Sequence, residues 1–276
     1  MVVTNTLKHT DMEDLLPVFN EAFSDYDIPI SMTAEAFASH LESLSYSKDD
    51  SVGLFDKRRL VGFLLIGRRG SVAYDAGTGI IPSYRGRGLS HTLIDAAAAH
   101  LAARGCTTFV LEVLDTNTKA KNLYQSHGFA IRRNLLCFSA KQDELVGQSD
   151  LLLEPHEDGY RVPSCYESSY QNNDQSVAEG LYTCSDIVEK GTRKGVAWYH
   201  HTRGSIAQIN IEPQYRDENF MKEAIISCAR ACTTQTVRIL NVDEADTVVI
   251  NALQAAGFTK FTTQSEMVLI LEEQKQ

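Results

Sequence analysis

Hydrophobic and polar residues alternate along the first 140 residues in two patterns, one with the spacing of helices and one with the spacing of strands. Apolar residues at helical spacing predict a first helix, and Thr10 with Glu13 gives it a capping-box pattern at its start. In chain order we expect a strand at 2–7, helices at 10–23 and 33–44, strands at 51–56, 60–68 and 72–82, a helix at 89–101, a strand at 106–115, a helix at 117–127 and a strand at 129–140. This order predicts a mixed α/β unit.

The same order of elements returns in the second half of the chain. Residues 80–115 and 211–244 both contain a strand, a proline, the pair Tyr-Arg, a helix and a β-branched strand. Both stretches continue to a short helix that ends in Gly-Phe. An internal repeat of this kind indicates that one fold occurs twice. Because residues 141–150 are mostly polar, we expect one domain at 1–145 and a diverged copy at 150–276.

Composition limits the classes of function. Of the 276 residues, 43% are hydrophobic and 22% are charged, as in a globular protein, and the net charge is −10. That charge disfavours nucleic acid and anionic membranes as partners, and the aromatic and basic residues are not interleaved as RNA binding requires. No apolar run approaches the roughly 18 residues of a membrane span. Six cysteines without a CxxC pair and the absence of a signal-peptide core predict a cytoplasmic protein, and the eight scattered histidines predict no metal site.

A loop rich in glycine and arginine, Arg85-Gly86-Arg87-Gly88, stands between a predicted strand and a predicted helix. Glycines let the backbone approach a ligand closely, and the first N–H groups of a helix lack partners at its positive end. Such a loop can hold a phosphate, with the arginines adding charge. The loop is neither a Walker loop nor a dinucleotide fingerprint. By itself it also fits a surface turn or an RNA-binding patch.

With its context, the loop resembles the signature Arg/Gln-x-x-Gly-x-Gly/Ala of the GNAT superfamily of acyl-CoA-dependent N-acyltransferases, with serine in the last position. The family's Asn-x-x-Ala-x-x-Leu-Tyr…Gly-Phe block is matched downstream by Asn117, Ala120, Leu123, Tyr124, Gly128 and Phe129. The resemblance covers about residues 2–140 and is faint beyond them. It implies an α/β fold of two GNAT-like units, each a mostly antiparallel mixed sheet flanked by helices.

The resemblance also implies a cofactor, acetyl-CoA, with CoA as the product. Its pyrophosphate would lie on the N–H groups of the loop and the helix start, and its pantetheine arm would pair with the strand before them. Glycines at 77 and 79 fit this pairing, because glycine inside a strand often marks a bulge or a close backbone approach. The expected cofactor-binding residues are Thr78, Gly79, Ile80, Arg85, Gly86, Arg87, Gly88, Leu89, Ser90, His91 and Asn117.

Acyl transfer to an amine needs a neutral amine, a stabilised oxyanion and a proton for the departing thiolate. The resemblance assigns the proton to Tyr124, and the alternative is a partly buried aromatic residue in a contact between helix and sheet. Glu112 and Asp75 are candidate bases because each interrupts an apolar strand, although strand alternation could aim either one outward. The loop 23–31 would line the acceptor side, where Tyr26 and Asp27 are candidate substrate ligands.

The second half has lost these features. Asp217 and Glu218 follow Arg216 where the first half has its glycine loop, and Leu253 falls opposite Tyr124. We expect this half to bind no CoA and to have a structural or substrate-shaping role. The chain as a whole is predicted to transfer an acetyl group from acetyl-CoA to a primary amine of a small molecule or peptide within a ternary complex. The alternative is a CoA-binding sensor or scaffold without turnover. No pattern identifies the acceptor or an oligomeric state.

Overall fold

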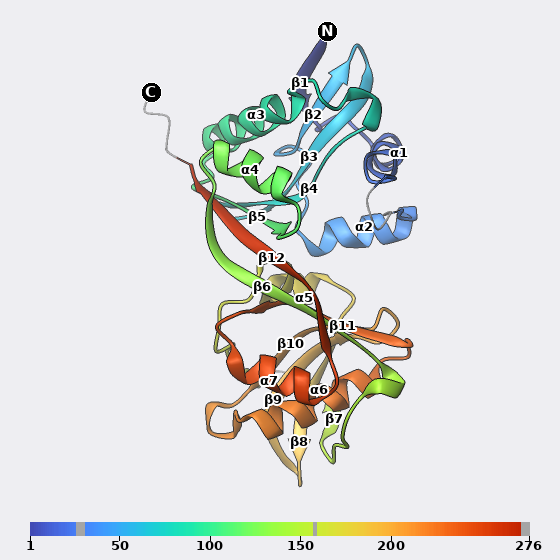
Figure 1. Ribbon diagram of the computed structural model, residues 1–276, viewed down its shortest axis with the longest axis vertical. Helices are drawn as coiled ribbons and strands as arrows, with labels where there is room; N and C mark the ends of the chain where they lie inside the picture. The colour runs from blue at the N-terminus through green and yellow to red at the C-terminus, as the bar shows by residue number, and fades with distance from the viewer. Residues whose placement is uncertain (26–30, 157–158, 272–276) are drawn as a thin grey trace. The chain divides into compact units, whose positions relative to one another are not determined.

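The computed structural model describes residues 1–25, 31–156 and 159–271 (Figure 1). They form two compact units. Unit 1 consists of residues 1–113, 117–132 and the described residues from Glu266 onward, and unit 2 consists of residues 114–116 and 133–265. Each unit is a mixed sheet flanked by helices, which confirms the predicted fold class.

Unit 1 contains all the elements that the hydrophobic pattern predicted for residues 2–127. They are β1 (Val2–Thr6), α1 (Met12–Ala22), α2 (Ala34–Ser43), β2 (Val52–Asp56), β3 (Arg59–Arg69), β4 (Val72–Ile80), α3 (Leu89–Ala103), β5 (Thr108–Leu114) and α4 (Thr118–Ser126). The predicted capping box is wrong, because the N-cap of α1 is Asp11 rather than Thr10, and its side chain makes no capping hydrogen bond.

The sheet of unit 1 has the strand order β1-β2-β3-β4-β5, followed by the end of β12 (Thr259–Ile270). The first four strands pair antiparallel, whereas β4 and β5 pair parallel. Figure 1 shows α1 and α2 beside one face of the sheet and α3 and α4 beside the other. The ring of Phe19 in α1 lies 4.7 Å from that of Phe37 in α2 and 5.6 Å from that of Phe63 in β3. Aromatic packing therefore holds α1 against the sheet and α2 against α1.

Unit 2 repeats this arrangement with fewer helices. Its elements are β6 (Ala130–Lys141), β7 (Leu152–Pro155), α5 (Asp174–Glu179), β8 (Thr183–Glu189), β9 (Thr192–His200), β10 (Ser205–Ile211), α6 (Glu218–Ala231), β11 (Thr236–Asp243), α7 (Thr247–Ala255) and β12 up to Ser265. The strand order is β12-β6-β11-β10-β9-β8-β7. Its core includes the fully buried residues Met221, Ile225, Val237 and Leu253.

The units are not consecutive segments, as a division of the chain near residues 145–150 would make them. After Arg132, β6 continues in unit 2, and the last part of β12 belongs to unit 1. There the N–H of Leu271 donates to the carbonyl of Thr107 at 2.9 Å, and Arg132 pairs with the buried carboxylate of Glu266 at 3.3 Å. Unit 1 is thus completed by residues more than 130 positions further along the chain.

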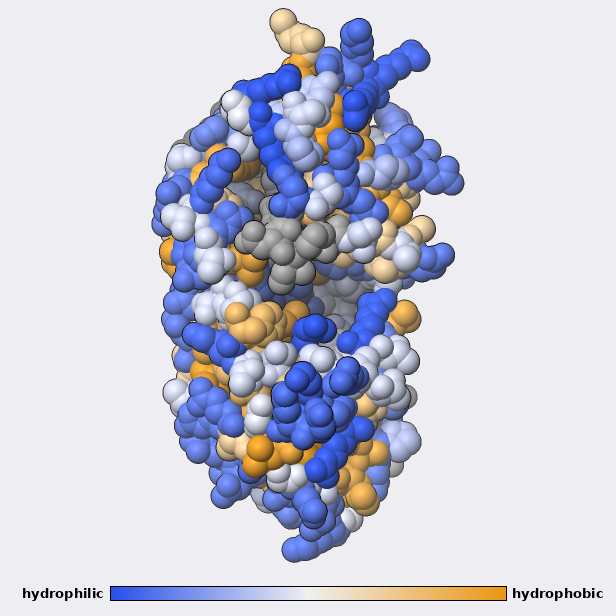
Figure 2. All heavy atoms as spheres, turned by 45° about the vertical axis from the view of Figure 1, so that its right-hand side comes forward, coloured by the Kyte–Doolittle hydropathy of each residue, from blue (hydrophilic) through white to orange (hydrophobic). Residues whose placement is uncertain are grey.

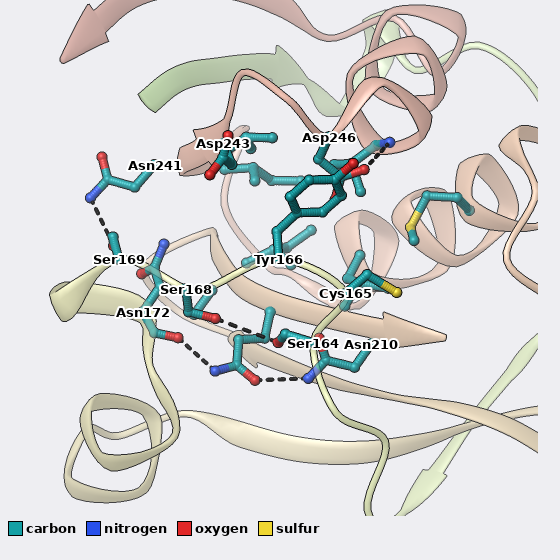
Figure 3. Close-up of a pocket in the computed structure, with 18 of the residues that line it drawn as sticks. Ser164, Cys165, Tyr166, Ser168, Ser169, Asn172, Asn210, Asn241, Asp243 and Asp246 are labelled. Atoms are coloured by element: carbon teal, nitrogen blue, oxygen red, sulfur yellow. Dashed lines mark hydrogen bonds between the residues drawn. The ribbon is translucent and has the colours of Figure 1, made fainter. Parts of the chain in front are cut away.

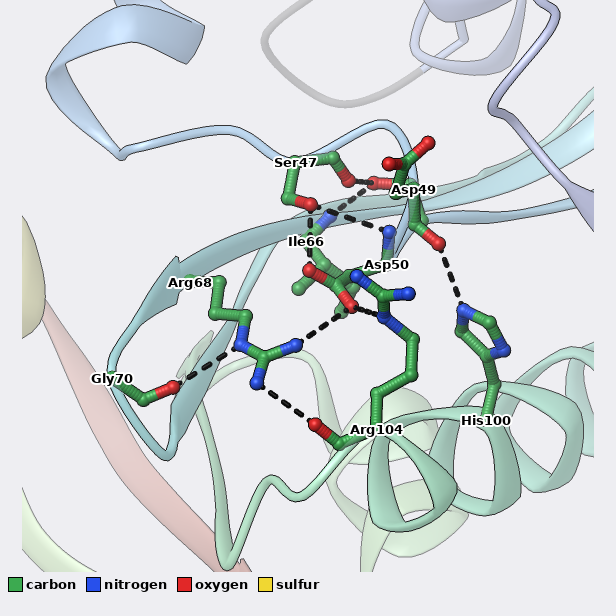
Figure 4. A network of polar contacts seen from close by, with 9 residues as sticks. Ser47, Asp49, Asp50, Ile66, Arg68, Gly70, His100 and Arg104 are labelled. Carbon is green, nitrogen blue, oxygen red and sulfur yellow. Dashed lines mark hydrogen bonds and ion pairs between the residues drawn. The ribbon is translucent and has the colours of Figure 1, made fainter.

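A buried carboxylate fixes the C-terminal end of α3 (Figure 4). The side chain of Asp50 is 2% exposed and pairs with Arg104 and, at 3.1 Å, with Arg68. The Ser47 hydroxyl donates to it at 2.6 Å. Burial alone would raise the pKa of Asp50, but the Ser47 hydrogen bond and the two guanidinium groups outweigh burial, so the pKa is lowered. The network ties α3 to the sheet.

One face of the molecule is largely polar. Hydrophilic side chains cover most of the face drawn in Figure 2, and hydrophobic residues occur on it in smaller groups. Isolated apolar residues on a surface are normal. No helix in the part of the chain that the structure describes is long and apolar enough to cross a membrane.

Removing the end of β12 should destabilise unit 1. Met267 is fully buried there, and its loss together with the β5 edge contacts should cost about 2 kcal/mol or more of unfolding free energy. Denaturant unfolding of a chain that ends at Ser265 measures this, with a chain that ends at Leu271 as the control. Equal stability of the two chains would contradict the assignment of these residues to unit 1.

Asp50→Asn should lower the free energy of unfolding by about 1.5–3 kcal/mol at pH 7, because Arg68 and Arg104, whose side chains are 25% and 41% exposed, lose the charged acceptor that they share. The folded-state pKa of Asp50 is lowered, so its contribution is present above the ordinary aspartate pKa of 3.8. The difference between wild type and variant should vanish as the pH falls below that value. Asp49→Asn, next to it in the chain, is the control and should change little. A pH-independent difference would contradict this account.

Candidate functional site

The edge of β4 is open over its second half. β4 pairs with β5 only at residues 72–74, so beyond Tyr74 the described residues place no strand on that side of β4. A bulge marks the place, because the β3 partners Leu65 and Ile66 face Gly77 and Asp75 with one residue of β4 left over. The bulge that the glycines of this strand predicted is thereby confirmed. On this side of β4 an extended ligand can hydrogen bond to backbone groups that β5 does not reach.

Close packing explains Gly79. A Cβ atom there would lie 2.6 Å from the ring of Phe63 and 2.9 Å from the side chain of Ala22. Only glycine therefore allows β4 to lie this close to α1. At Gly77 the backbone φ is +153°, a value that side chains disfavour.

The glycine loop leads from this open edge into α3. Gly86 and Gly88 both have φ of +73°, in the left-handed region. A Cβ atom at either glycine would meet nothing within 4 Å. Gly88 is the N-cap of α3 and provides no side-chain hydrogen bond to the helix. The helix start is therefore positive, uncapped and open to a ligand, which are the requirements of an anion site.

The two arginines of the loop are engaged within the protein. Arg85 donates through Nε to the carbonyl of Ile80 at 2.8 Å, through Nη2 to that of Ala22 at 2.6 Å and through Nη1 to Asp25 at 2.6 Å. Its guanidinium group holds the pKa of Asp25 below the usual value. Arg85 thus ties the end of α1 to the end of β4, which differs from the expected phosphate contact. Arg87 lies 4.8 Å over the ring of Tyr84.

The structure brings two of the three predicted catalytic residues together. The hydroxyl of Tyr124, in α4, donates to Oδ2 of Asp75 at 3.0 Å. Thr78 donates to the same oxygen at 2.6 Å, and the N–H of Gly77 donates to Oδ1 at 2.9 Å. Desolvation raises the pKa of Asp75, although all three hydrogen bonds favour its charged form. A carboxylate with a raised pKa, linked to a phenol beside the open strand edge, can relay protons.

Glu112 lies elsewhere. Tyr74 and Val110 are paired across β4 and β5, and strand alternation places Glu112 on the face of Val110 and Asp75 on the opposite face. Glu112 is therefore not part of the group around Tyr124. The candidate acceptor ligands Tyr26 and Asp27 lie outside the described residues.

Asn117 has a structural contact that the sequence did not predict. Its Oδ1 accepts from the N–H of Ala120 at 3.1 Å and caps α4. The cap fixes the helix that carries Tyr124. The amide nitrogen of Asn117 is the part of this side chain left to face a ligand.

The sequence interpretation also missed a chain of polar contacts at the start of α3. Nδ1 of His91 lies 2.9 Å from Nε2 of His127, and Nδ1 of His127 lies 2.7 Å from Asp95. His91 and Asp95 are four residues apart on α3, a helical spacing that was available as a signal. This chain joins α4 to the helix that follows the glycine loop. Among the described residues, no three His, Cys, Asp or Glu side chains form a group that could hold a metal ion.

The corresponding helix start in unit 2 is closed. Oδ1 of Asp217 accepts from the N–H groups of Asn219 and Phe220, each at 2.9 Å, so the chain's own carboxylate caps α6. Nη2 of Arg216 donates to both oxygens of Asp246 at 2.6 Å. A carboxylate thus occupies the positions that remain open in unit 1.

Comparisons with known proteins agree with this geometry. Residues 12–129 match the model of the acetyltransferase (GNAT) family. The chain is 32% identical over 126 residues to mycothiol acetyltransferase from Thermobispora bispora, a match that covers 38% of this chain and 43% of that protein. The chain therefore matches less than half the length of this curated relative.

Solved structures resemble the whole chain at low identity. A tandem GNAT protein from the clavulanic acid biosynthesis pathway has a TM-score of 0.71 and 14% identity, and the match covers 99% of each chain. A GCN5-related N-acetyltransferase from Sphaerobacter thermophilus has a TM-score of 0.69 and 14% identity, with 98% of this chain and 96% of that chain covered. At such identities the likeness establishes the fold, and it extends over both units.

Proposed function

We propose that unit 1, in which residues 12–129 match the model of the acetyltransferase (GNAT) family, transfers an acetyl group from acetyl-CoA to a primary amine of a small molecule or peptide. The observation that carries the proposal is the open edge of β4, which ends at a glycine loop and an uncapped helix start. An extended amide chain that ends in phosphates fits a backbone edge followed by an anion site.

The proposed cofactor contacts are mostly made by the backbone. The pyrophosphate lies on the N–H groups between Gly86 and His91, including those of Arg87, Leu89 and Ser90. The pantetheine arm pairs with the edge of β4 at Thr78, Gly79 and Ile80. Arg85 is a positioning residue, because its hydrogen bonds to the carbonyls of Ile80 and Ala22 hold the end of β4 against α1. Asn117 contacts the pantetheine end through its amide nitrogen.

The proposed reaction moves one proton from the amine to the sulfur. The neutral amine attacks the thioester carbonyl, and the N–H of Ile80 stabilises the oxyanion. Asp75 accepts the proton that the amine loses, directly or through one water molecule. Tyr124 donates its proton to the departing thiolate and regains one from Asp75 along their 3.0 Å hydrogen bond. The products are the amide and CoA, and both residues return to their starting states.

A CoA-binding module without turnover is the second candidate, and the Tyr124–Asp75 contact favours catalysis over it. Unit 2 has no counterpart of this pair, since Leu253 stands opposite Tyr124 and is fully buried. We assign it no catalytic step. The net charge of −10 favours cationic acceptors through electrostatic steering. We also propose that the protein is cytoplasmic.

Carboxylates in the glycine loop should strongly weaken cofactor binding. Gly86→Glu combined with Gly88→Glu places negative charge beside the pyrophosphate and strains a left-handed backbone, so CoA affinity should fall about 100-fold or more. Gly105→Glu is the matched control, because Gly105 also has a positive φ, of +78°, and open space around it. Calorimetry with CoA measures both variants. If wild type, double variant and control bind CoA equally, the loop is not the phosphate site.

Tyr124→Phe should lower kcat by about 10²–10⁴-fold and leave CoA affinity unchanged, because it removes the acid and little packing. Tyr46→Phe, in the same unit, is the control. The raised pKa of Asp75 should put the acid limb of the wild-type kcat profile above the ordinary aspartate range, since the protonated carboxyl cannot accept a proton. Asp75→Asn should remove this limb and lower the plateau.

Initial-rate measurements over an amine panel give these values. Full activity of the phenylalanine variant would exclude the proton path. CoA binding by the wild type without turnover of any amine would favour the sensor over the transferase.

A further inference from the structure

Unit 2 contains a cavity where its two central strands separate. β10 and β11 pair only at Ser205–Arg238 and Ile206–Ile239, and beyond these pairs a cavity of about 110 Å³ opens between them. Residues 164–172, here called the strap, close one side; they are irregular except for a short 3-10 helix at Tyr170–Asn172 (Figure 3). A space of this size holds several water molecules or one small organic molecule.

The wall formed by the strap and β10 is rich in neutral polar groups. The Ser164 hydroxyl donates to Asn210 at 2.9 Å, and Asn210 donates to Gln208 at 3.0 Å. Asn241 of β11 donates to the Ser169 hydroxyl at 3.3 Å. All five side chains line the cavity, and Figure 3 labels Ser164, Ser169, Asn210 and Asn241. The strap is therefore bound to the strands by hydrogen bonds between amides and hydroxyls.

The opposite wall carries charge of both signs. The side chain of Arg216 is 13% exposed, and the hydrogen bonds of its guanidinium group within the described residues all run from Nη2 to Asp246. Its Nε and Nη1 donors therefore stay available to a ligand in the cavity. Asp243 lines the same wall and pairs with Arg133 at 2.9 Å. In the equivalent arginine of unit 1, Arg85, all three guanidinium nitrogens already donate hydrogen bonds within the protein.

These charges select among ligand classes. Phosphate esters such as CoA are disfavoured, because Asp217 already caps the helix start and Asp246 stands beside Arg216. A simple cation would meet Arg216, and a simple anion would meet the aspartates. A small molecule with a carboxylate and an ammonium group satisfies both, with the carboxylate on Arg216 and the ammonium on Asp246 or Asp243. The apolar side chains of Met221 and Val249 can pack against its remaining atoms.

We propose that the cavity of unit 2 is a binding site for a small zwitterion of the α-amino acid class, held by Arg216 and the two aspartates beneath the strap. The site lies in the unit that has no acetyl-transfer machinery and uses none of the residues proposed for cofactor binding. The proposal is therefore independent of the proposed function and would stand if unit 1 proved to bind no acetyl-CoA.

The test uses the full chain and the common L-amino acids as probes, each at on the order of 10 mM, in thermal unfolding followed by calorimetry. At least one probe should bind and raise Tm. Arg216→Gln should weaken that binding about tenfold or more, because it removes the charged donors. Arg238→Gln, an arginine exposed on β11, is the matched control and should leave the affinity unchanged.

A second variant and a competition experiment with inorganic phosphate complete the test. Ser164→Tyr, on the exposed strap, should fill the mouth of the cavity and block the same probe even if Arg216→Gln fails to fold. Inorganic phosphate should not compete. The proposal is overturned if no amino acid binds the wild type, if binding survives both variants, or if phosphate displaces the bound probe.

Discussion

The parting of two parallel strands is the constraint on which the rest of this structure depends. In unit 1, β4 and β5 share only the pairs at residues 72–74 and 108–110, and the bulge opposite Leu65 and Ile66 turns β4 away. Unpaired backbone groups inside a protein are costly, so the open edge is stable only beside water or a ligand that can hydrogen bond to it. Every proposed element of the site follows from that edge: the glycine loop continues it, Arg85 holds its end, and Asp75 with Tyr124 lies at its bulge.

The two units share the same order of elements but differ in how the helix start is capped. Both have a strand, a proline turn and a helix start in the same order, but unit 1 leaves its helix start without a cap and unit 2 caps it with Asp217. A carboxylate on the first N–H groups of a helix gains the same dipole interaction that a bound phosphate would gain. The loss of cofactor binding that we propose for unit 2 is thus compatible with a stable helix, and unit 2 has a cavity between β10 and β11 with its own set of charges.

The sequence predicted the elements of unit 1 well, because apolar periodicity and glycine positions depend on local structure. Gly77 and Gly79 correctly indicated the bulge and the close approach. The sequence did not predict that the end of β12 belongs to unit 1, because this depends on pairing between residues far apart in the chain. The same limit applied to Arg85, whose partners Ala22 and Asp25 lie some 60 positions away, and to Glu112, whose strand face is set by the register of β5.

Calorimetric titration of the full wild-type chain with acetyl-CoA is the most direct test of the central claim. The claim is that one of two similar strand gaps is a cofactor site and the other is not. The account predicts a single class of sites with one acetyl-CoA per chain. Two molecules per chain would show that the carboxylates of Asp217 and Asp246 do not close unit 2 to the cofactor. No binding at all would contradict the assignment of the β4 edge and the glycine loop.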